Sequence, residues 1–264
     1  MISLQNIQKY FHKGSVNEVF ALNNINLEIE EGDFITVIGS NGAGKSTLLN
    51  CIAGSFFPDS GTITINNCDV TAWPEYKRAR FISRVFQDPL LGTCPSATIM
   101  QNMALAVRRG MKRGLAPGVK KKDKAMFREQ LAHLGLGLED RLLDTVGLLS
   151  GGQRQALTML MATMIRPDVL LLDEHIAALD PKTANQILNL TRDIVREQHL
   201  TTLMITHNMN HAITFGNRLI MLHQGRIILD LKGKEKENLT VKELLAKFYQ
   251  SQGEELANDS LLLG

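Results

Sequence analysis

The chain has 264 residues, 44% of them hydrophobic, and a formal charge of +2 from 29 basic and 27 acidic side chains. This length allows one large domain with its own core, and the balanced charge argues against binding nucleic acid through overall charge. No apolar run approaches the roughly 20 residues that cross a bilayer, and the N-terminus lacks a charged start before an apolar run, so we expect a soluble, unexported protein. The cysteines, Cys51, Cys68 and Cys94, are odd in number, widely spaced and without a CxxC pair, which fits a reducing cytoplasm rather than a disulfide framework or zinc site.

The first 88 residues read mostly as strands. Apolar and polar residues alternate at 25–29, and short apolar runs predict further strands at 34–38, 62–65 and 80–86. The segment STLLNCIAG, which follows a glycine-rich loop, predicts a helix that ends at Gly54. The N-terminal part is therefore expected to be rich in strands.

Strand patterns are absent from about 95 to 148, where Met, Leu, Ala and Arg predominate and a basic stretch with Gly and Pro interrupts the helical pattern. We expect an inserted, mostly helical lobe there. The runs VLLL at 169–172 and TTLMIT at 201–206 have apolar residues on both faces and predict buried parallel strands, with a helix at 182–197 between them. A late hairpin and a polar tail follow, and the predicted fold class is α/β.

The segment GSNGAGKST matches the phosphate-loop pattern GxxxxGK[ST], and it lies between a predicted strand and a predicted helix, as that pattern requires. Its glycines allow backbone N–H groups to converge on phosphate oxygens at a helix N-terminus, and Lys45 is predicted to reach the β and γ phosphates. The Ser46 hydroxyl is a predicted Mg²⁺ ligand. The predicted nucleotide-binding residues here are Gly39, Ser40, Asn41, Gly42, Ala43, Gly44, Lys45, Ser46 and Thr47.

Three polar residues follow apolar strands. Asp173 and Glu174 end the strand at 169–172, and His207 follows the strand at 201–206. Ligands of parallel sheets bind at the carboxyl ends of the strands, so we assign Asp173 to the metal, Glu174 to the attacking water and His207 to the γ-phosphate.

Six motifs in a fixed order carry a resemblance to a known family. GSNGAGKS, Gln87 in VFQDP, LSGGQ, LLLDE, AALD and His207 together resemble the ATP-binding subunits of ABC transporters, over about residues 2 to 230. The resemblance implies a P-loop NTPase of ABC type with a mixed sheet core and an antiparallel N-terminal β subdomain. It also implies a single ABC ATPase domain over 1–264, with a helical subdomain inserted at about 89–155 and a tail at about 232–264, and ATP and Mg²⁺ as cofactors.

The resemblance also implies a role for the second glycine-rich segment, LSGGQ. In the family two subunits pair head to tail, and each presents its LSGGQ segment to the γ-phosphate that the other holds. The implied residues are Ser150, Gly151, Gly152 and Gln153, and Asp180 is implied to contact the partner. Because Pro181 and a predicted helix follow it, Asp180 is also an expected helix N-cap.

Two further roles rest on the resemblance alone. Gln87 is implied to contact Mg²⁺ or the attacking water, although its residue type and position by themselves favour a strand cap. An aromatic ring before the phosphate loop is implied to stack on adenine. Phe11 aligns best with that role, Tyr10 is its neighbour, and either ring can instead belong to the core.

Two features depart from the family pattern. His175 and Ile176 stand where the family commonly has Pro or Ala and then Thr or Ser, and the lost hydroxyl is expected to loosen the loop that leads to Asp180. The stretch 108–128 is longer and more basic than usual. It reads most simply as a solvated loop, with contact to anionic lipid headgroups or a permease as the functional alternative.

The expected function is ATP hydrolysis by a homodimer that drives a separate membrane permease, with uptake of a small solute such as an amino acid, and an extracytoplasmic solute-binding protein as indirect partner. The protein is expected to bind peripherally at the cytoplasmic face of the inner membrane and to have no nucleic-acid partner. An exporter or lipid-extraction system is the nearer alternative. A soluble ABC ATPase of translation or DNA repair is further away, because one phosphate loop and no sustained heptads are present.

Overall fold

A computed structural model describes residues 1–111, 118–119 and 121–252 of the chain. The chain divides into two compact units: unit 1 contains Met1–Arg78 and the residues from Thr201 on, and unit 2 contains Ala79–Leu200. Within the described residues no helix has the length and apolar content needed to cross a membrane. Each unit is described in turn.

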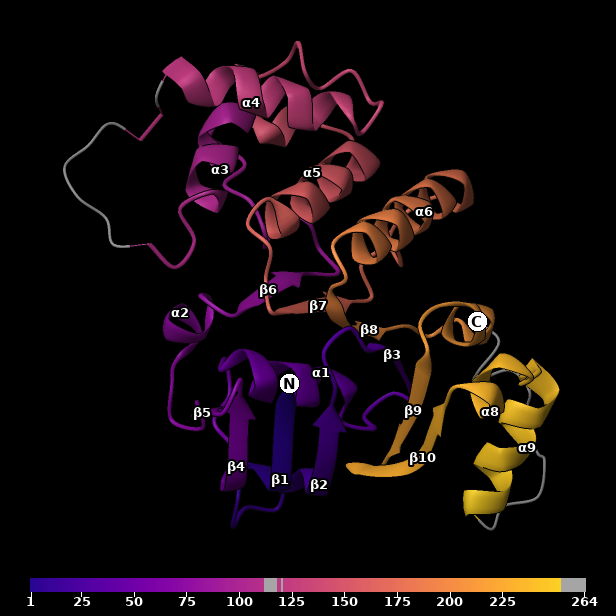
Figure 1. Ribbon diagram of the computed structural model, residues 1–264. Helices are drawn as coiled ribbons and strands as arrows, with labels where there is room; N and C mark the ends of the chain where they lie inside the picture. Colours follow the sequence, from indigo (N-terminus) through magenta and orange to yellow (C-terminus); the bar gives the residue numbers. More distant parts are fainter. Residues whose placement is uncertain (112–117, 120, 253–264) are drawn as a thin grey trace. The chain divides into compact units, whose positions relative to one another are not determined.

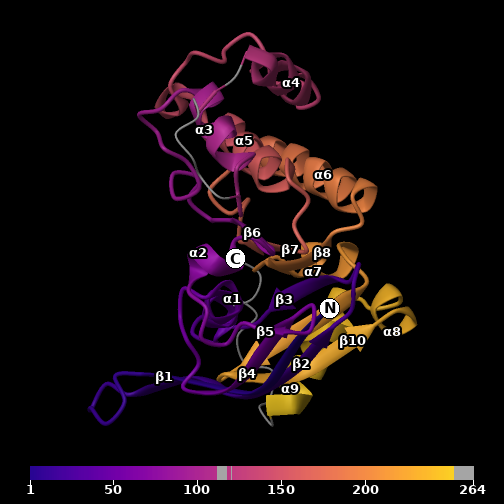
Figure 2. The same cartoon turned by 60° about the vertical axis from the view of Figure 1, so that its left-hand side comes forward.

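Unit 1 contains a four-stranded antiparallel sheet in the order β2-β1-β4-β5 (Figure 1). Its strands are β1 (Ile2–Phe11), β2 (Val19–Ile29), β4 (Ser60–Ile65) and β5 (Cys68–Asp69). Ile25, Leu27 and Ile29 are buried while the residues between them are exposed, as the alternation predicted. The β1–β2 connection extends away from the rest of this sheet (Figure 2).

Four more strands of unit 1 lie in the order β10-β9-β3-β8. Central β3 pairs in parallel with both β8 and β9, and β10 pairs antiparallel with β9. The five residues of β8 are all buried, as expected for an apolar parallel strand. The bounds are β3 (Phe34–Ile38), β8 (Thr201–Ile205), β9 (Arg218–His223) and β10 (Arg226–Lys232).

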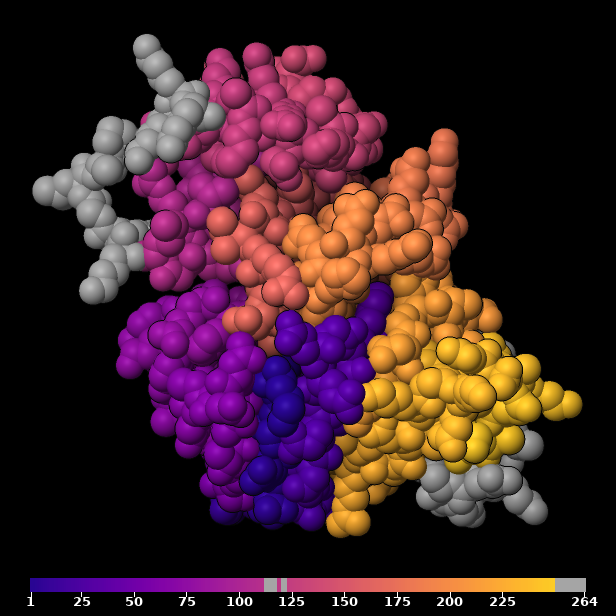
Figure 3. Space-filling view, in the orientation of Figure 1, coloured from indigo at the N-terminus to yellow at the C-terminus, as the bar shows by residue number. Residues whose placement is uncertain are grey.

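The first helix of unit 1, α1, is bounded by glycine residues at both ends. Helix α1 begins directly after the glycine-rich loop and ends at Gly54, which adopts a left-handed conformation, as the sequence predicted. The C-terminal helices α8 and α9 pack on β10. In the space-filling view the yellow C-terminal segment lies beside the orange segment that precedes it (Figure 3). The helices are α1 (Lys45–Ala53), α2 (Glu75–Arg78), α7 (Met209–Thr214), α8 (Lys234–Glu237) and α9 (Val241–Gln252).

The described residues of unit 2 form two parallel strands and four α-helices. Strands β6 (Ile82–Val85) and β7 (Val169–Asp173) pair in register. Helices α3, α4 and α5 share an apolar core, and α5 also packs on α6 (Figure 1). The helical elements are α3 (Ile99–Ala106), α4 (Lys121–Ala132), a short 3-10 turn (Val146–Leu148), α5 (Gly151–Thr163) and α6 (Pro181–Glu197).

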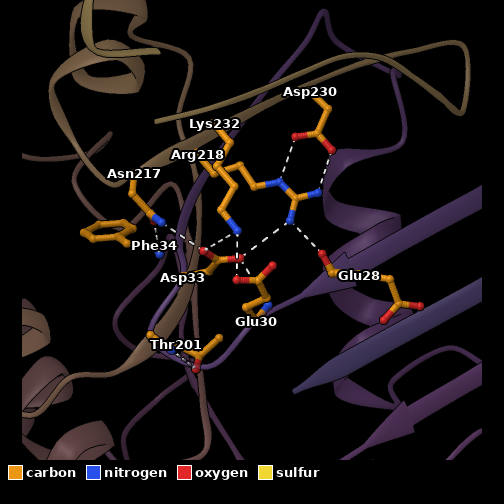
Figure 4. A network of polar contacts seen from close by, with 10 residues as sticks. Glu28, Glu30, Asp33, Phe34, Thr201, Asn217, Arg218, Asp230 and Lys232 are labelled. Carbon is orange, nitrogen blue, oxygen red and sulfur yellow. Dashed lines mark hydrogen bonds and ion pairs between the residues drawn. The ribbon is translucent and has the colours of Figure 1, made fainter. Parts of the chain in front are cut away.

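A buried carboxylate fixes the start of β3 against β9 and β10 (Figure 4). Asp33 is 4% exposed, accepts a hydrogen bond from Asn217 Nδ2 at 2.9 Å, and lies 3.6 Å from both Arg218 Nη1 and Lys232 Nζ. Burial by itself raises the pKa of Asp33, but the hydrogen bonds from Asn217 and the Glu30 backbone, with the two cations, outweigh it and lower the pKa. This network holds the strand that leads into the glycine-rich loop.

A buried lysine fixes α8 against the same strands. Lys236 is 2% exposed, and its ammonium donates to the carbonyls of Phe215 and Gly216, the latter at 3.0 Å, and to Thr36 Oγ1 at 3.4 Å. Burial lowers the pKa of Lys236 from 10.5 to about 8. The charged form is therefore less favourable in the folded chain than in the unfolded one.

We predict that Lys236 makes stability increase with pH in the alkaline range. Its destabilising effect is complete below about pH 8 and is relieved as the pH rises towards the unfolded pKa of 10.5, because the unfolded chain then binds more protons. Urea unfolding of wild type and Lys236→Met measures this difference. From about pH 8 to about pH 10, the free energy of unfolding of wild type should gain on that of the variant, by at most about 1.4 kcal/mol per pH unit. A constant difference across this range would contradict the prediction.

Candidate functional site

The glycine-rich loop between β3 and α1 lies with its backbone directly against neighbouring strands. A Cβ atom added at Gly39 would lie 2.2 Å from the carbonyl oxygen of Leu222 in β9, and one at Gly44 would lie 2.4 Å from that of Ala21 in β2. Gly225, in the β9–β10 turn, donates its N–H to the carbonyl of Ala43 at 3.0 Å. The loop therefore requires glycine at 39 and 44 for lack of space, in addition to their positive φ angles.

The same loop presents positive charge and open space. Lys45 is 6% exposed, and its ammonium donates to the carbonyls of Gly39 at 2.8 Å and Ser40 at 3.0 Å. A Cβ at Gly42 would meet no atom within 4 Å, and no side chain caps the N-terminus of α1. A lysine and an uncapped helix N-terminus in one loop are suited to bind phosphate. Asn41 and Ser46 are exposed, Thr47 is half-buried, and Ala43 is buried.

His207 lies at the same edge of the β3–β8 pair as this loop. Strand β8 ends at Ile205, which pairs with Val37 of β3, and His207 is exposed two residues further on. The two strands run parallel, so their carboxyl ends lie together. Unit 1 thus contains the phosphate loop and His207 on one strand edge, as the sequence predicted.

The other predicted catalytic residues lie at the carboxyl edge of β6 and β7 in unit 2. Asp173 ends β7 and Glu174 follows it in a left-handed conformation, with φ 46°. Gln87 lies two residues beyond the end of β6 and is exposed, and Val85 pairs with Leu172 in the parallel register. The structure therefore gathers these three polar residues on one strand edge.

Asp173 is paired with a residue that the sequence analysis did not single out. The Arg84 Nη2 atom in β6 lies 2.6 Å from Asp173 Oδ2. No local pattern indicates this pair, because the two residues are 89 positions apart in the chain.

His175, the departure from the family pattern, has a structural partner. It is 2% exposed, and its Nε2 atom lies 3.1 Å from the Thr191 hydroxyl in α6. This contact connects the residue after Glu174 to a helix. The loosening expected from the missing hydroxyl at Ile176 stays a prediction.

The LSGGQ segment forms the N-terminus of α5. Ser150 is the N-cap: its Oγ accepts from the Gln153 N–H at 3.2 Å, and the Gln153 side chain accepts from the Ser150 N–H at 3.2 Å. Because Ser150 Oγ acts as the acceptor in this pair, its own proton remains available to a ligand. Ser150 and Gly151 are exposed. The segment is a capped, exposed helix N-terminus suited to bind an anion.

Asp180 caps α6, as predicted. Its carboxylate accepts from the Thr183 N–H at 3.1 Å, and Pro181 occupies the first helical turn. The side-chain and backbone hydrogen bonds with Thr183 lower the pKa of Asp180, and the residue is exposed. A contact of Asp180 with a partner subunit stays a prediction.

The two candidate adenine-stacking rings have different neighbours at the end of β1. Tyr10 stacks on Phe20 with centroids 4.0 Å apart and an interplanar angle of 5°, and Lys13 Nζ lies 5.0 Å from the Tyr10 centroid. Phe11 meets Phe56 edge to face at 5.3 Å. Lys9 Nζ also lies 5.7 Å from the Phe11 centroid. Both rings therefore have an aromatic neighbour and a cation neighbour, and stacking of Phe11 on adenine stays a prediction.

The basic stretch 108–128 is described only in part, because Lys112, Arg113 and Lys120 lie outside the described residues. One of its cations has a structural use: Arg109 donates to the carbonyls of Ala162, at 2.9 Å, and Ile165. Arg109 therefore caps the C-terminal end of α5, and burial lowers its pKa. Contact of the remaining cations with lipid or a permease stays a prediction.

We predict that Gly152 and Gly151 tolerate alanine to different degrees. A Cβ at Gly152 would lie 2.2 Å from Thr183 Cγ2 in α6, whereas one at Gly151 would lie 3.6 Å from its nearest neighbour. Gly152→Ala should lower the free energy of unfolding by about 1–3 kcal/mol through overpacking. Gly151→Ala is the matched control, and adding Thr183→Ser, which removes the obstructing methyl, should restore most of the loss. Equal urea stability of the two alanine variants would disprove this.

Comparisons with known proteins agree with this geometry. Residues 22–177 match the family model described as ABC transporter. The chain is 49% identical over 250 residues to the tyrosine transport ATP-binding protein of Clostridioides difficile (strain R20291), covering 94% of this chain and 98% of that protein. It is 37% identical over 214 residues to the thiamine import ATP-binding protein ThiQ of Salmonella typhimurium, covering 81% and 85%.

Solved structures similar to this chain are also ATP-binding cassettes. The dimeric ATP-binding cassette MJ0796, in a post-hydrolysis state with bound ADP and Pi, has a TM-score of 0.73 and 32% identity, covering 88% of this chain and 98% of that one. The ADP conformation of the cassette MJ1267 has a TM-score of 0.76 and 26% identity, covering 94% and 98%. The predicted α/β fold of ABC type is confirmed. This chain belongs to the ABC transporter family, as an ATP-binding and ATP-hydrolysing subunit.

Proposed function

We propose that two copies of this chain close head to tail on two Mg–ATP and thereby drive a membrane permease that takes up a small solute. The observation that carries the proposal is that one chain contains both a phosphate loop with a buried lysine and a second exposed helix N-terminus at Ser150. Each can bind phosphate. A dimer in which each loop meets the other chain's Ser150 segment gives both a use.

In this proposal the phosphate loop holds the β and γ phosphates by its N–H groups and Lys45, which exchanges its two carbonyl acceptors for phosphate oxygens. His207 donates a hydrogen bond to the γ-phosphate. Phe11 stacks on the adenine. The partner chain adds Ser150, Gly151, Gly152 and Gln153 at the γ-phosphate, with Asp180 beside them.

The exposed hydroxyl of Ser46 and the carboxylate of Asp173 are hard oxygen ligands. Mg²⁺ prefers such ligands together with phosphate oxygens, so these two residues fit the ion. Gln87 is the further candidate ligand. When bound, Mg²⁺ would neutralise charge that develops on the phosphates. Glu174 orients the attacking water and accepts its proton.

The proposed cargo is an amino acid, with tyrosine as the first candidate, and the proposed direction is uptake. The support is the 49% identity to a tyrosine transport ATP-binding protein and the likeness to a thiamine import protein. The chain is proposed to act peripherally at the cytoplasmic membrane face, with a solute-binding protein supplying the cargo to the permease.

The dimer is tested with Glu174→Gln. Without its proton acceptor, the chain should bind ATP but hydrolyse it slower by about 10²-fold or more, and a closed dimer should accumulate with ATP and Mg²⁺. Light scattering after size exclusion measures this. Lys45→Ala placed in the same chain is the control, and should remain monomeric because phosphate binding is lost. A Glu174→Gln chain that remains monomeric with ATP and Mg²⁺ would rule out the head-to-tail dimer.

The cargo is tested by transport of labelled tyrosine in cells of the source organism. A strain without this chain should accumulate less tyrosine than its parent, and wild-type protein, but not Glu174→Gln, should restore uptake. Labelled methionine serves as the control solute. Higher tyrosine accumulation in the deletion strain would point to export, and unchanged tyrosine uptake would exclude tyrosine as the cargo.

A further inference from the structure

Arg84 faces the carboxylate that the proposed function assigns to the metal. In the parallel register of β6 and β7, Arg84 pairs with Leu171. Side chains paired in this way share a face of the sheet, and so do residues two apart on one strand, so Arg84 and Asp173 lie on the same face. The guanidinium Nη2 reaches Asp173 Oδ2 at 2.6 Å, which is a short, charge-assisted hydrogen bond.

The guanidinium also contacts an aromatic ring. The Arg84 Cζ atom lies 4.6 Å from the centroid of the Phe86 ring, directly after the end of β6. The side chains of Arg84 and Asp173 are only 11% and 14% exposed, so water screens the pair weakly. Arg84 is thus a fixed charge between a ring and a carboxylate, unlike a mobile surface arginine.

A fixed positive charge on this carboxylate opposes the arrival of a divalent cation. An oxygen of Asp173 that accepts from a guanidinium is already partly neutralised, and the cation is repelled by the guanidinium itself. The triphosphate of ATP brings the negative charge that offsets this repulsion. Such a carboxylate binds a metal weakly by itself and strongly only when nucleotide accompanies it.

We propose that Arg84 is a positioning residue that lowers the affinity of Asp173 for Mg²⁺ and so makes metal uptake depend on bound nucleotide. This inference rests on the proposed function, because it takes Asp173 as the metal carboxylate. It concerns a side chain with no assigned role in that function.

The test measures how strongly Mg²⁺ improves nucleotide binding. Isothermal calorimetry with a non-hydrolysable ATP analogue gives the Kd in EDTA and the Kd in excess Mg²⁺, and their ratio is the coupling between metal and nucleotide. In Arg84→Met this ratio should be roughly tenfold smaller than in wild type, because Asp173 without the repelling charge also binds Mg²⁺ in the absence of nucleotide. The ratio cancels any effect on nucleotide binding itself.

Two matched variants separate charge at this place from other effects. Arg84→Lys retains the positive charge and should keep the coupling close to that of wild type. Arg80→Met removes an arginine that also packs on a ring, with its Cζ atom 4.4 Å from the Phe81 centroid, and controls for the change in net charge. Its coupling should equal that of wild type.

A coupling in Arg84→Met that is unchanged or larger than in wild type would overturn the inference. If the methionine variant does not fold, Arg84→Gln, which is polar but uncharged, should show the same decrease in coupling, and an unchanged coupling there would overturn the inference equally. Failure of wild type to bind the analogue even in excess Mg²⁺ would instead overturn the proposed function. The two failures are therefore distinguishable.

Discussion

The close approach of the phosphate loop to two neighbouring strands is the constraint on which the rest of unit 1 depends. The positions that Cβ atoms would take at Gly39 and Gly44 are occupied by carbonyl oxygens of Leu222 and Ala21. Gly225, in the β9–β10 turn, connects the loop to β2 by two hydrogen bonds. Its N–H donates to the carbonyl of Ala43 in the loop, and its carbonyl accepts from the N–H of Asn23 in β2. Strands β2 and β9 therefore support the backbone of the loop directly.

The helix that follows the loop has two ends with opposite chemistry. Its N-terminus has no side-chain cap and remains available to an anion. Its C-terminal carbonyls at Cys51 and Ile52 accept from Arg78, at 2.6 and 2.8 Å. Arg78 is fully buried, and burial lowers its pKa to about 10. The carbonyls that accept from its guanidinium stabilise the charged form at the C-terminal end of α1. Lys45, by contrast, donates to two carbonyls of the phosphate loop itself.

The two glycine-rich segments, GSNGAGKST and LSGGQ, each lie at a helix N-terminus, but their glycines pack against different neighbours. At Gly39 and Gly44 the absence of a side chain lets the backbone approach other strands, whereas at Gly152 it lets α5 approach Thr183 on α6. Ser150 and Gln153 cap α5 reciprocally, which fixes the segment before any ligand arrives. Preformed anion sites of this kind bind with little ordering cost.

The sequence by itself determined the local features: the phosphate loop, the strand-ending positions of Asp173 and His207, the caps at Gly54 and Asp180, and the α/β fold. These depend on glycine conformation, helix-end hydrogen bonding and hydrophobic period, which operate over a few residues. Only the tertiary structure decided which side chains far apart in the chain meet. Arg84 with Asp173, His175 with Thr191 and Gly152 with Thr183 are pairs set by strand register and helix packing, and no local pattern encodes such pairings.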